Sequence, residues 1–388
     1  MEPYSRVYAK IHLDRIIDNI KVMKAGLREH TGVMAVVKAD GYGHGAIPVA
    51  HAVEPYVEFY AAATVEEAVS LRKHGIEKPV LVLGVIQEQD YEKALAWDIR
   101  FCVFQLSRAS HLAQTAIAMG KTAKVHLAVD TGMGRIGLLA EDPHAVEEAV
   151  DISRLTGLEV EGIFTHFARA DEADKVWAER QLSLFLQFMD QLTHQGVSIP
   201  WRHCANSAAI IDMKQADLDL VRAGIAMYGL SPSDEVEAGH LALAPAMELK
   251  SCISYLKMVP AGAQISYGGI YTTTEPTRVA TIPVGYADGY PRNLSGKGRV
   301  LIRGMEAKIL GRICMDQFMV DVTHIPDAVE GDEVTLLGSD GDDAITVEEI
   351  AALSGGFHYE LLCGISKRVP RVYVKEGTIV GTSDYFDQ

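Results

Sequence analysis

A lysine at the end of an apolar run is the first residue in this chain that could do chemistry. The stretch MAVVKADGYGHG, residues 34–45, leads from four apolar residues into Lys38 and then into a glycine-rich loop. Lysine is among the residues least often fully buried, so an isolated lysine at a strand end is usually just solvated. A desolvated amine at this point would instead be a nucleophile or would form an imine with a carbonyl group.

The elements that would position Lys38 follow a regular alternation. Helical spacing of apolar residues predicts a first helix from residue 13 and another within 172–195. Strands that alternate with helices are typical of parallel βα units, and eight of them in roughly 230 residues predict a (β/α)8 barrel. The eight strand-like runs are residues 34–39, 58–64, 79–84, 100–104, 123–130, 161–167, 202–207 and 220–225.

The pattern changes after the eighth run. Residues 231–245 are predicted to be a linker, and strand-like runs separated by glycine and proline then dominate. We therefore expect an α/β barrel over residues 13–240 and a mostly-β domain over 241–388, while residues 1–12 form a strand that packs with the β domain.

Composition narrows the possible partners. The 388 residues carry a net charge of −16, which argues against nucleic acid or an anionic membrane surface as the main partner. No apolar run is long enough to span a membrane, and the first residues do not form a secretory signal. Five scattered cysteines without a CxxC pair predict neither a disulfide framework nor a metal site. We expect a cytoplasmic protein.

Polar residues fall where a barrel places its chemistry, at the carboxyl ends of the strands. They are Lys38, Arg135, His166, Asn206, Ser207 and Arg222. Small residues after the last two strands could hold a phosphate through backbone N–H groups. A lysine and a phosphate cradle at one barrel mouth describe a pyridoxal phosphate site. The glycines of residues 132–137 match a dinucleotide motif only formally, because they follow the fifth strand and not the first.

Several motifs resemble the alanine racemase family and occur in family order over nearly the whole chain. They are MAVVKADGYGHG, VDTGMGRIG, GIFTHFA, HCANSAA, VRAGIAMYGL, ISYGGIYT, PVGYADGYPR, GRICMDQ and HYELLCGISKRVPR. The resemblance implies an enzyme that uses pyridoxal 5'-phosphate to interconvert L-alanine and D-alanine, which supplies D-alanine for peptidoglycan. It also implies a homodimer with two shared active sites.

The resemblance assigns roles to residues that match the motifs. Lys38 would hold the cofactor covalently, His166 would lie against its ring, Arg135 near its phenolic oxygen and Arg222 at its pyridine nitrogen. The remaining cofactor-binding residues would be Tyr42, Asn206, Ser207, Gly224, Ile225 and Tyr359. The partner subunit would bring Tyr267, Tyr286 and Met315 to the substrate, which Arg135 also binds.

Racemisation itself requires two groups on opposite faces of the substrate. One removes a proton from the α-carbon and the other returns a proton on the far side, a task that suits Lys38 and Tyr267. A free tyrosine has a pKa near 10, and the family implies that His166 and Arg222 assist Tyr267. Because a guanidinium can only donate, Arg222 would leave the pyridine nitrogen unprotonated.

One position departs from the family pattern. Many members have a carbamylated lysine just before the DTGM motif, where this chain has Ala128 and Val129. Arg135 would then be held by a carboxylate, a bound anion such as chloride, or water.

Two other functions remain open besides alanine racemisation. One is a non-catalytic pyridoxal phosphate carrier, which would resemble only the first half of the chain. The other is a decarboxylase, which would use a cysteine and an aspartate from the β domain. A broader racemase that also accepts serine is a further possibility.

Overall fold

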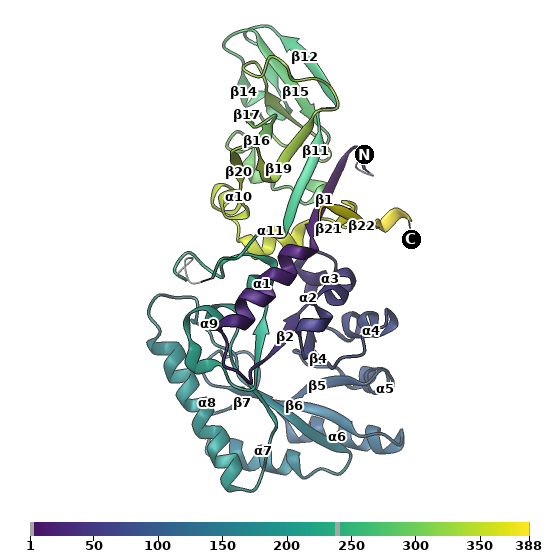
Figure 1. Cartoon of the computed structure of the whole chain (residues 1–388), viewed down its shortest axis with the longest axis vertical. Coiled ribbons are helices and arrows are strands. Elements are labelled where there is room, and N and C mark those ends of the chain that lie inside the picture. The colour runs from purple at the N-terminus through teal and green to yellow at the C-terminus, as the bar shows by residue number, and fades with distance from the viewer. Residues whose placement is uncertain (1–3, 237–240, 388) are drawn as a thin grey trace. The chain divides into compact units, whose positions relative to one another are not determined.

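The computed structural model describes residues 4–236 and 241–387, which form two compact units (Figure 1). The barrel unit comprises residues 15–41 and 46–245, and the β unit comprises residues 4–14, 42–45 and 246–387, within the described parts of the chain. Residue 240, the expected last residue of the barrel, and the middle of the expected linker, 237–240, lie outside the described residues, as do residues 1–3 and 388.

The barrel unit is built on eight parallel strands in the order β10-β2-β3-β4-β5-β6-β8-β9. Backbone bonds from Asp219 N–H to Arg202 O (3.1 Å) and from Arg222 N–H to Ala205 O (3.0 Å) join the two ends of this order. The predicted barrel class is therefore confirmed. The strands are β2 (Gly32–Val36), β3 (Phe59–Ala62), β4 (Val80–Val82), β5 (Ile99–Val103), β6 (Ala123–Asp130), β8 (Leu158–Phe164), β9 (Trp201–His203) and β10 (Leu220–Ala223), with a short β7 (Leu138–Leu139) beside β6.

Amphipathic helices connect these strands, and each buries one face. In α4, Val65, Ala68 and Val69 are buried, while Thr64 and Glu67 form a capping box that starts the helix. The long helix expected within 172–195 is α8, Val176–His194. The others are α1 (Leu13–Gly26), which precedes β2, and α3 (Ala46–Val53), α5 (Tyr91–Ala96), α6 (Leu106–Ala118), α7 (Ala145–Ser153) and α9 (Ser207–Asp212). The five-residue segment α2 (Lys38–Tyr42) has positive φ values and is a turn.

The β unit contains a large sheet in the order β12-β15-β18-β17-β16-β19-β11-β1-β21-β22. One strand of this sheet comes from the start of the chain. It is β1 (Val7–His12), which pairs antiparallel with β11 and parallel with β21. The other elements are β11 (Met247–Cys252), β12 (Tyr255–Val259), β13 (Gln264–Ile265), β14 (Tyr271–Thr272), β15 (Thr277–Ile282), β16 (Arg299–Ile302), β17 (Met305–Leu310), β18 (Phe318–Asp321), β19 (Glu333–Asp340), β20 (Asp343–Ile345), α10 (Val347–Ser354), α11 (His358–Gly364), β21 (Arg371–Lys375) and β22 (Thr378–Ser383).

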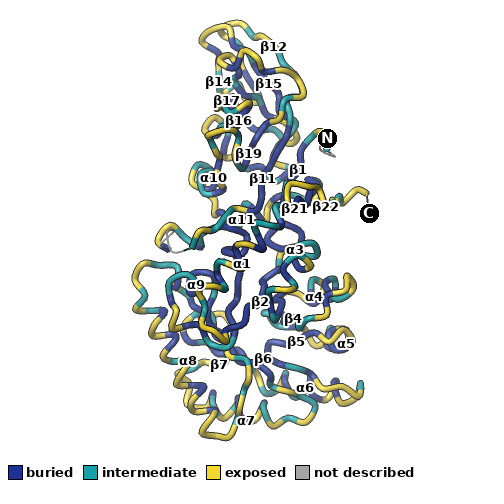
Figure 2. Tube along the Cα trace, viewed as in Figure 1, coloured by how far each residue is buried: buried dark blue, intermediate teal, exposed yellow. Residues whose placement is uncertain are grey.

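Four neighbouring strands of the barrel, β2 to β5, are completely buried (Figure 2). Every residue of β2, β3, β4 and β5 is buried, as expected for strands of a parallel sheet whose two faces are covered. Among the described residues, no helix combines the length and apolar character needed to cross a bilayer.

Asp217, just before β10, predicts how stability depends on pH. Its side chain is buried, its Oδ1 has no hydrogen-bond partner among the described residues, and burial raises its pKa from 3.8 to about 6. Unfolding therefore releases this proton between about pH 4 and pH 6, so the free energy of unfolding falls by about 3 kcal/mol across this window as pH rises.

Replacing Asp217 with asparagine should remove this penalty. We expect Asp217→Asn to be more stable than the parent by up to about 3 kcal/mol near pH 8 and to lose that advantage near pH 4. Urea unfolding of both proteins at the two pH values measures the difference. A variant that is less stable than the parent at pH 8 would show that the carboxylate makes favourable contacts when it is ionised.

Candidate active site

Lys38 lies directly after the first barrel strand. Strand β2 ends at Val36, and Val37 still continues the sheet through a bond from its N–H to Ala61 O (2.9 Å). The Lys38 side chain is half-buried, and its charge acts on the imidazole of His166. The sheet therefore holds Lys38 at the carboxyl end of the barrel, where enzymes with this fold carry out their chemistry.

The backbone after Lys38 makes a left-handed turn. Ala39, Asp40, Gly41 and Tyr42 all have φ values between 51° and 63°. This conformation costs a non-glycine residue about 1–2 kcal/mol, so other contacts must hold it in place. The carboxylate of Asp40 accepts a hydrogen bond from Ala46 N–H (2.8 Å) at the start of α3.

Glu67 holds the other side of this turn, a role that was not predicted from the sequence. Its Oε1 accepts from Ala39 N–H (2.7 Å), while Oε2 accepts from Ala63 N–H (2.8 Å) and Thr64 N–H (3.3 Å). One carboxylate thus ties the residue after Lys38 to the end of β3 and the start of α4. The capping-box spacing of Thr64 and Glu67 is visible in the sequence, but its reach to Ala39 is not.

Arg222, in the last barrel strand, is buried and donates only to neutral acceptors. Its Nη1 donates to His203 Nδ1 (2.9 Å) and His203 O (3.2 Å), and its Nη2 donates to His166 Nδ1 (3.0 Å) and to the carbonyls of Thr165 and Cys204, both at 2.9 Å. Burial lowers the pKa of Arg222 to about 10, which leaves it charged at neutral pH. The structure thus brings the predicted residues His166 and Arg222 into direct contact.

His166 is neutral in this setting. Burial, followed by the positive charges of Arg222, Arg135 and Lys38, puts its pKa well below the ordinary value for histidine. Because a guanidinium can only donate, the His166 Nδ1 that faces Arg222 must accept, and the ring proton is on Nε2. His166 can therefore donate a hydrogen bond from Nε2 to a group beside it.

The small residues after β9 and β10 are held together by one hydroxyl. Ser207 Oγ accepts from Gly224 N–H (3.1 Å) and Ala226 N–H (3.2 Å), and Asn206 caps α9 by accepting from Ala209 N–H (3.1 Å). Ile225 begins the 3-10 turn Ile225–Tyr228 and is buried. Asn206, Ser207, Gly224 and Ile225 thus form one compact backbone corner at the strand ends.

Arg135 is exposed on the loop after β6. Asp130 Oδ1 shapes that loop by accepting from the N–H groups of the three residues Gly132–Gly134. Within residues 4–236 and 241–387, no carboxylate forms an ion pair with Arg135. Ala128 is buried with Cys102 and Phe164 and so contributes apolar packing in place of a polar brace. A carboxylate was one of the three groups expected to hold Arg135, and the described residues do not provide one.

The β unit presents Tyr267 to solvent on a strained turn. The side chain is 70% exposed, and Ser266 before it has φ 67°, a value that favours glycine. Ser266 Oγ donates to Arg312 O (2.6 Å) and lies 3.5 Å from Cys314 Sγ. Such strain persists only where surrounding contacts fix it, so Tyr267 is an exposed phenol on an anchored backbone.

Tyr286 and Met315 lie on two loops that are bonded to each other. Tyr286 N–H donates to Cys314 O (3.1 Å), and Ala287 N–H donates to Met315 O (3.0 Å). Both Tyr286 and Met315 are large exposed side chains. Because Cys314 also contacts Ser266, the structure gathers the loops that carry Tyr267, Tyr286 and Met315 into one exposed group within the β unit.

Tyr42 and Tyr359 also belong to the β unit, with their ring centroids 6.1 Å apart. Arg371 Nε donates to Gly43 O (3.0 Å), which fixes the loop that follows Tyr42. Glycine is required at position 43, since a Cβ there would lie 2.2 Å from Leu362 O. The thirteen candidate residues therefore form two groups, eight in the barrel unit and five in the β unit.

Asp288 supports the exposed group, and its removal should be costly. This buried carboxylate pairs with Arg6 (2.7 Å) and Arg368 (3.0 Å) and accepts from Gly285 N–H (3.0 Å), next to Tyr286. We expect Asp288→Ala to lower the free energy of unfolding by about 3 kcal/mol, because two guanidinium groups and a backbone N–H each lose one hydrogen-bond acceptor. Chemical denaturation measures this loss.

The matched control for this prediction is Asp316→Ala. Asp316 pairs with Arg368 (2.9 Å) but is exposed, so its removal should cost less than about 1 kcal/mol. Equal losses in the two variants would contradict the role assigned to Asp288.

The hydrogen bonds of Arg222 support the fit of the barrel residues to pyridoxal phosphate. Among the described residues, no protein acceptor takes the Nε–H of Arg222, although the other guanidinium nitrogens are fully engaged. A donor without a protein partner suits a ring nitrogen that carries a lone pair. Lys38 supplies the amine that this cofactor needs.

A closed parallel barrel with an amine, an imidazole and a buried guanidinium at its strand ends, followed by a β unit, defines a two-domain barrel enzyme. Family models for the N-terminal and C-terminal domains of alanine racemase match residues 11–232 and 246–373. The alanine racemase of Desulforamulus reducens is 46% identical over 369 residues, which cover 95% of this chain and 99% of that protein.

Solved structures agree with the sequence comparisons. The alanine racemase of Clostridium difficile 630 superposes with a TM-score of 0.95 at 40% identity and covers 99% of this chain and 100% of its own. The Bacillus anthracis alanine racemase with bound L-Ala-P has a TM-score of 0.92 at 36% identity, with both chains fully covered. This chain belongs to the alanine racemase family of isomerases. The predicted family, fold class and activity are thereby confirmed.

Proposed function

We propose that this chain racemises alanine with pyridoxal 5'-phosphate bound at the carboxyl end of the barrel, in a homodimer whose subunits lend each other Tyr267, Tyr286 and Met315. The observation that carries the proposal is the separation of the candidates. The amine that can hold the cofactor is in the barrel unit, whereas the second acid–base group is an exposed phenol in the β unit. An exposed, anchored tyrosine is suited to serve the site of another subunit.

The cofactor would be held by groups from several strand ends. Lys38 would provide the covalent link, and Arg222 would donate its Nε–H to the ring nitrogen. His166 would pack against the ring. The phosphate would be bound by the corner of Asn206, Ser207, Gly224 and Ile225, together with Tyr42 and Tyr359. When bound, pyridoxal phosphate supplies the electron sink that makes the α-hydrogen of alanine acidic.

Lys38 and Tyr267 would carry the proton on opposite faces of the α-carbon. The amine of Lys38 removes or returns it on one side, and the phenol of Tyr267 acts on the other. His166 assists through its Nε2–H, since a hydrogen bond donated to the phenolic oxygen stabilises the ionised phenol. Arg222 keeps His166 in the tautomer that can donate.

The substrate would be held by Arg135, whose guanidinium is available on an exposed loop, and confined by Met315 and Tyr286. A pocket lined by a methionine and tyrosines favours a small side chain. An apolar pocket rejects an added hydroxyl by only about a hundredfold, so serine should react more slowly than alanine.

Incubation of the purified chain with L-alanine tests this function. We expect D-alanine to appear until the two enantiomers are equal, without release of carbon dioxide, and the activity to require added pyridoxal phosphate after the cofactor is removed. Chiral chromatography and carbon dioxide measurement separate the outcomes. Carbon dioxide without D-alanine would indicate a decarboxylase, and neither product would indicate a non-catalytic binding protein.

A further inference from the structure

Two buried histidines connect Arg222 to a carboxylate inside the barrel. Arg222 Nη1 bonds His203 Nδ1 (2.9 Å), His203 Nε2 bonds His126 Nδ1 (2.9 Å), and His126 Nε2 bonds Glu161 Oε1 (3.4 Å). His203 is on β9, His126 on β6 and Glu161 on β8, and both histidine rings are fully buried. The chemistry described above uses none of His203, His126 and Glu161.

The two ends of this row permit only one arrangement of protons. A guanidinium has no acceptor, so His203 Nδ1 must accept from Arg222 and the His203 proton must be on Nε2. That proton is donated to His126 Nδ1, which leaves the His126 proton on Nε2. An ionised carboxylate can only accept, so Glu161 receives this last proton. The structure thus assigns the Nε2–H tautomer to both histidines.

The electrostatics agree with this arrangement. Burial lowers the pKa of His126, and burial with the charge of Arg222 puts the pKa of His203 well below its ordinary value, so both rings are neutral. For Glu161, burial alone would raise the pKa, but the bond from His126 and the charge of Arg100 outweigh it and keep the carboxylate ionised.

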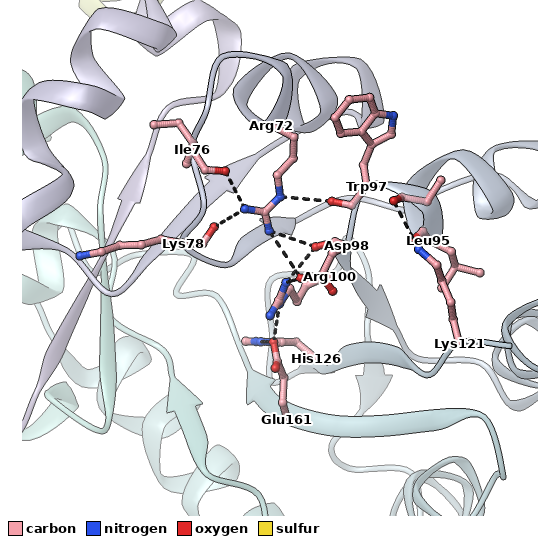
Figure 3. Close-up of polar contacts among 11 residues, drawn as sticks. Arg72, Ile76, Lys78, Leu95, Trp97, Asp98, Arg100, Lys121, His126 and Glu161 are labelled. Atoms are coloured by element: carbon pink, nitrogen blue, oxygen red, sulfur yellow. Dashed lines mark hydrogen bonds and ion pairs between the residues drawn. The ribbon is translucent and has the colours of Figure 1, made fainter. Parts of the chain in front are cut away.

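The acceptor end of the row is itself held firmly (Figure 3). Arg100 Nε donates to Glu161 Oε1 (3.1 Å), and Arg100 Nη1 donates to the carboxylate (2.6 Å) and the carbonyl (2.8 Å) of Asp98. Arg72 donates to the carbonyl of the same Asp98 (3.1 Å). Glu161 therefore sits between a fixed guanidinium on one side and the histidine row on the other.

We propose that Glu161 is a positioning residue of the active site, which acts through His126 and His203 to hold the Arg222 guanidinium in a single orientation with its Nε–H available. The inference rests on the role proposed above for Arg222 at the cofactor. Without Glu161, the proton of His126 has no acceptor, the His126 ring is free to turn, and His203 loses the partner that keeps its Nδ1 toward Arg222.

Histidine NMR of the full chain, carrying its cofactor and labelled with ¹⁵N at histidine, tests the proposal directly. We expect His126 and His203 each to show a protonated Nε2 and an unprotonated Nδ1. Glu161→Leu should replace this single pattern at His126 with mixed tautomers. It should also lower kcat about tenfold, equivalent to one lost hydrogen bond, with KM for alanine changed less than about twofold.

Two further variants distinguish the proposed positioning role of Glu161 from a simple effect of its charge and from a nonspecific effect of changing a residue on β8. In Glu161→Gln the amide oxygen can still accept from His126, so both tautomers and most of kcat should be retained, and this variant also serves if Glu161→Leu fails to fold. Glu159→Leu changes an exposed carboxylate on the same strand and should match the parent in spectrum and kcat.

The proposal is overturned if His203 carries its proton on Nδ1 in the parent, or if Glu161→Leu keeps the parent spectrum. A changed spectrum with an unchanged kcat overturns the link to the reaction. The spectra do not depend on turnover. A chain that failed to racemise alanine would therefore refute the proposed function and would still leave the proton arrangement decided by NMR.

Discussion

Replacing Lys38 with alanine should abolish racemisation, with kcat/KM reduced by at least about a thousandfold. Lys38 has two proposed roles, because its amine holds the cofactor and then moves a proton at the α-carbon. The variant should also lose the visible absorbance of the bound cofactor on gel filtration, a readout that does not depend on turnover. D-alanine formation and the absorbance spectrum measure the two effects.

Two further variants define what this loss means. Lys38→Arg keeps the positive charge, but a guanidinium stays protonated and cannot form the covalent link, so it should be as inactive as Lys38→Ala. Lys73→Ala removes an exposed lysine of α4 and should match the parent. Turnover by Lys38→Ala with its cofactor absorbance intact would refute the assignment.

Replacing Tyr267 with phenylalanine should lower kcat by about 100- to 10,000-fold in both directions, the range expected for loss of one acid–base group. Both directions suffer because each requires one group to remove a proton and the other to return it. The remaining Lys38 can still exchange the α-hydrogen that faces it. In deuterated water the variant should therefore exchange the α-hydrogen of one enantiomer without inverting it, and mass spectrometry follows this exchange.

The control for this prediction is Tyr255→Phe, which removes another exposed phenol of the β unit and should leave activity unchanged. Full activity of Tyr267→Phe, or α-hydrogen exchange in both enantiomers at equal rates, would show that Tyr267 is not the second acid–base group.

The fold was predictable because its signals are local. Most of the barrel strands are visible as short apolar runs, and the run at 123–130 coincides with β6. The run at 202–207 is an exception, because it is largely polar and overlaps β9 at only two residues. The run at 161–167 was placed late, since β8 occupies Leu158–Phe164. Its first four residues, Leu158–Glu161, alternate between apolar and polar side chains and do not form a continuous apolar run. A search for apolar runs therefore misses the start of this strand.

The polar framework of the site was less predictable, because its partners are far apart in the sequence. Glu67 was visible as a capping residue, but its bond to Ala39 depends on the left-handed turn after Lys38. His126 and His203 lie on different strands, and nothing in their spacing indicates that His126 Nδ1 and His203 Nε2 lie 2.9 Å apart. Such contacts arise only when the barrel closes.

The division of the candidates between two units could be predicted only through the family resemblance. Nothing in the ISYGG motif itself indicates that Tyr267 is exposed on strained backbone, since the positive φ of Ser266 and its bond to the distant residue Arg312 are visible only in the folded β unit. The surroundings of Arg135 were also only partly predictable from the sequence. The absence of a lysine at position 128 was visible, but the apolar packing that replaces it was not.

Complementation between two inactive variants tests most directly whether each active site draws Lys38 from one subunit and Tyr267 from the other. Lys38→Ala and Tyr267→Phe carry different affinity tags, are co-expressed, and their heterodimer is isolated through both tags. We predict that the heterodimer recovers about half of the parent activity per dimer, because one of its two sites regains both groups while the other loses both. A heterodimer as inactive as its two parents would contradict the account.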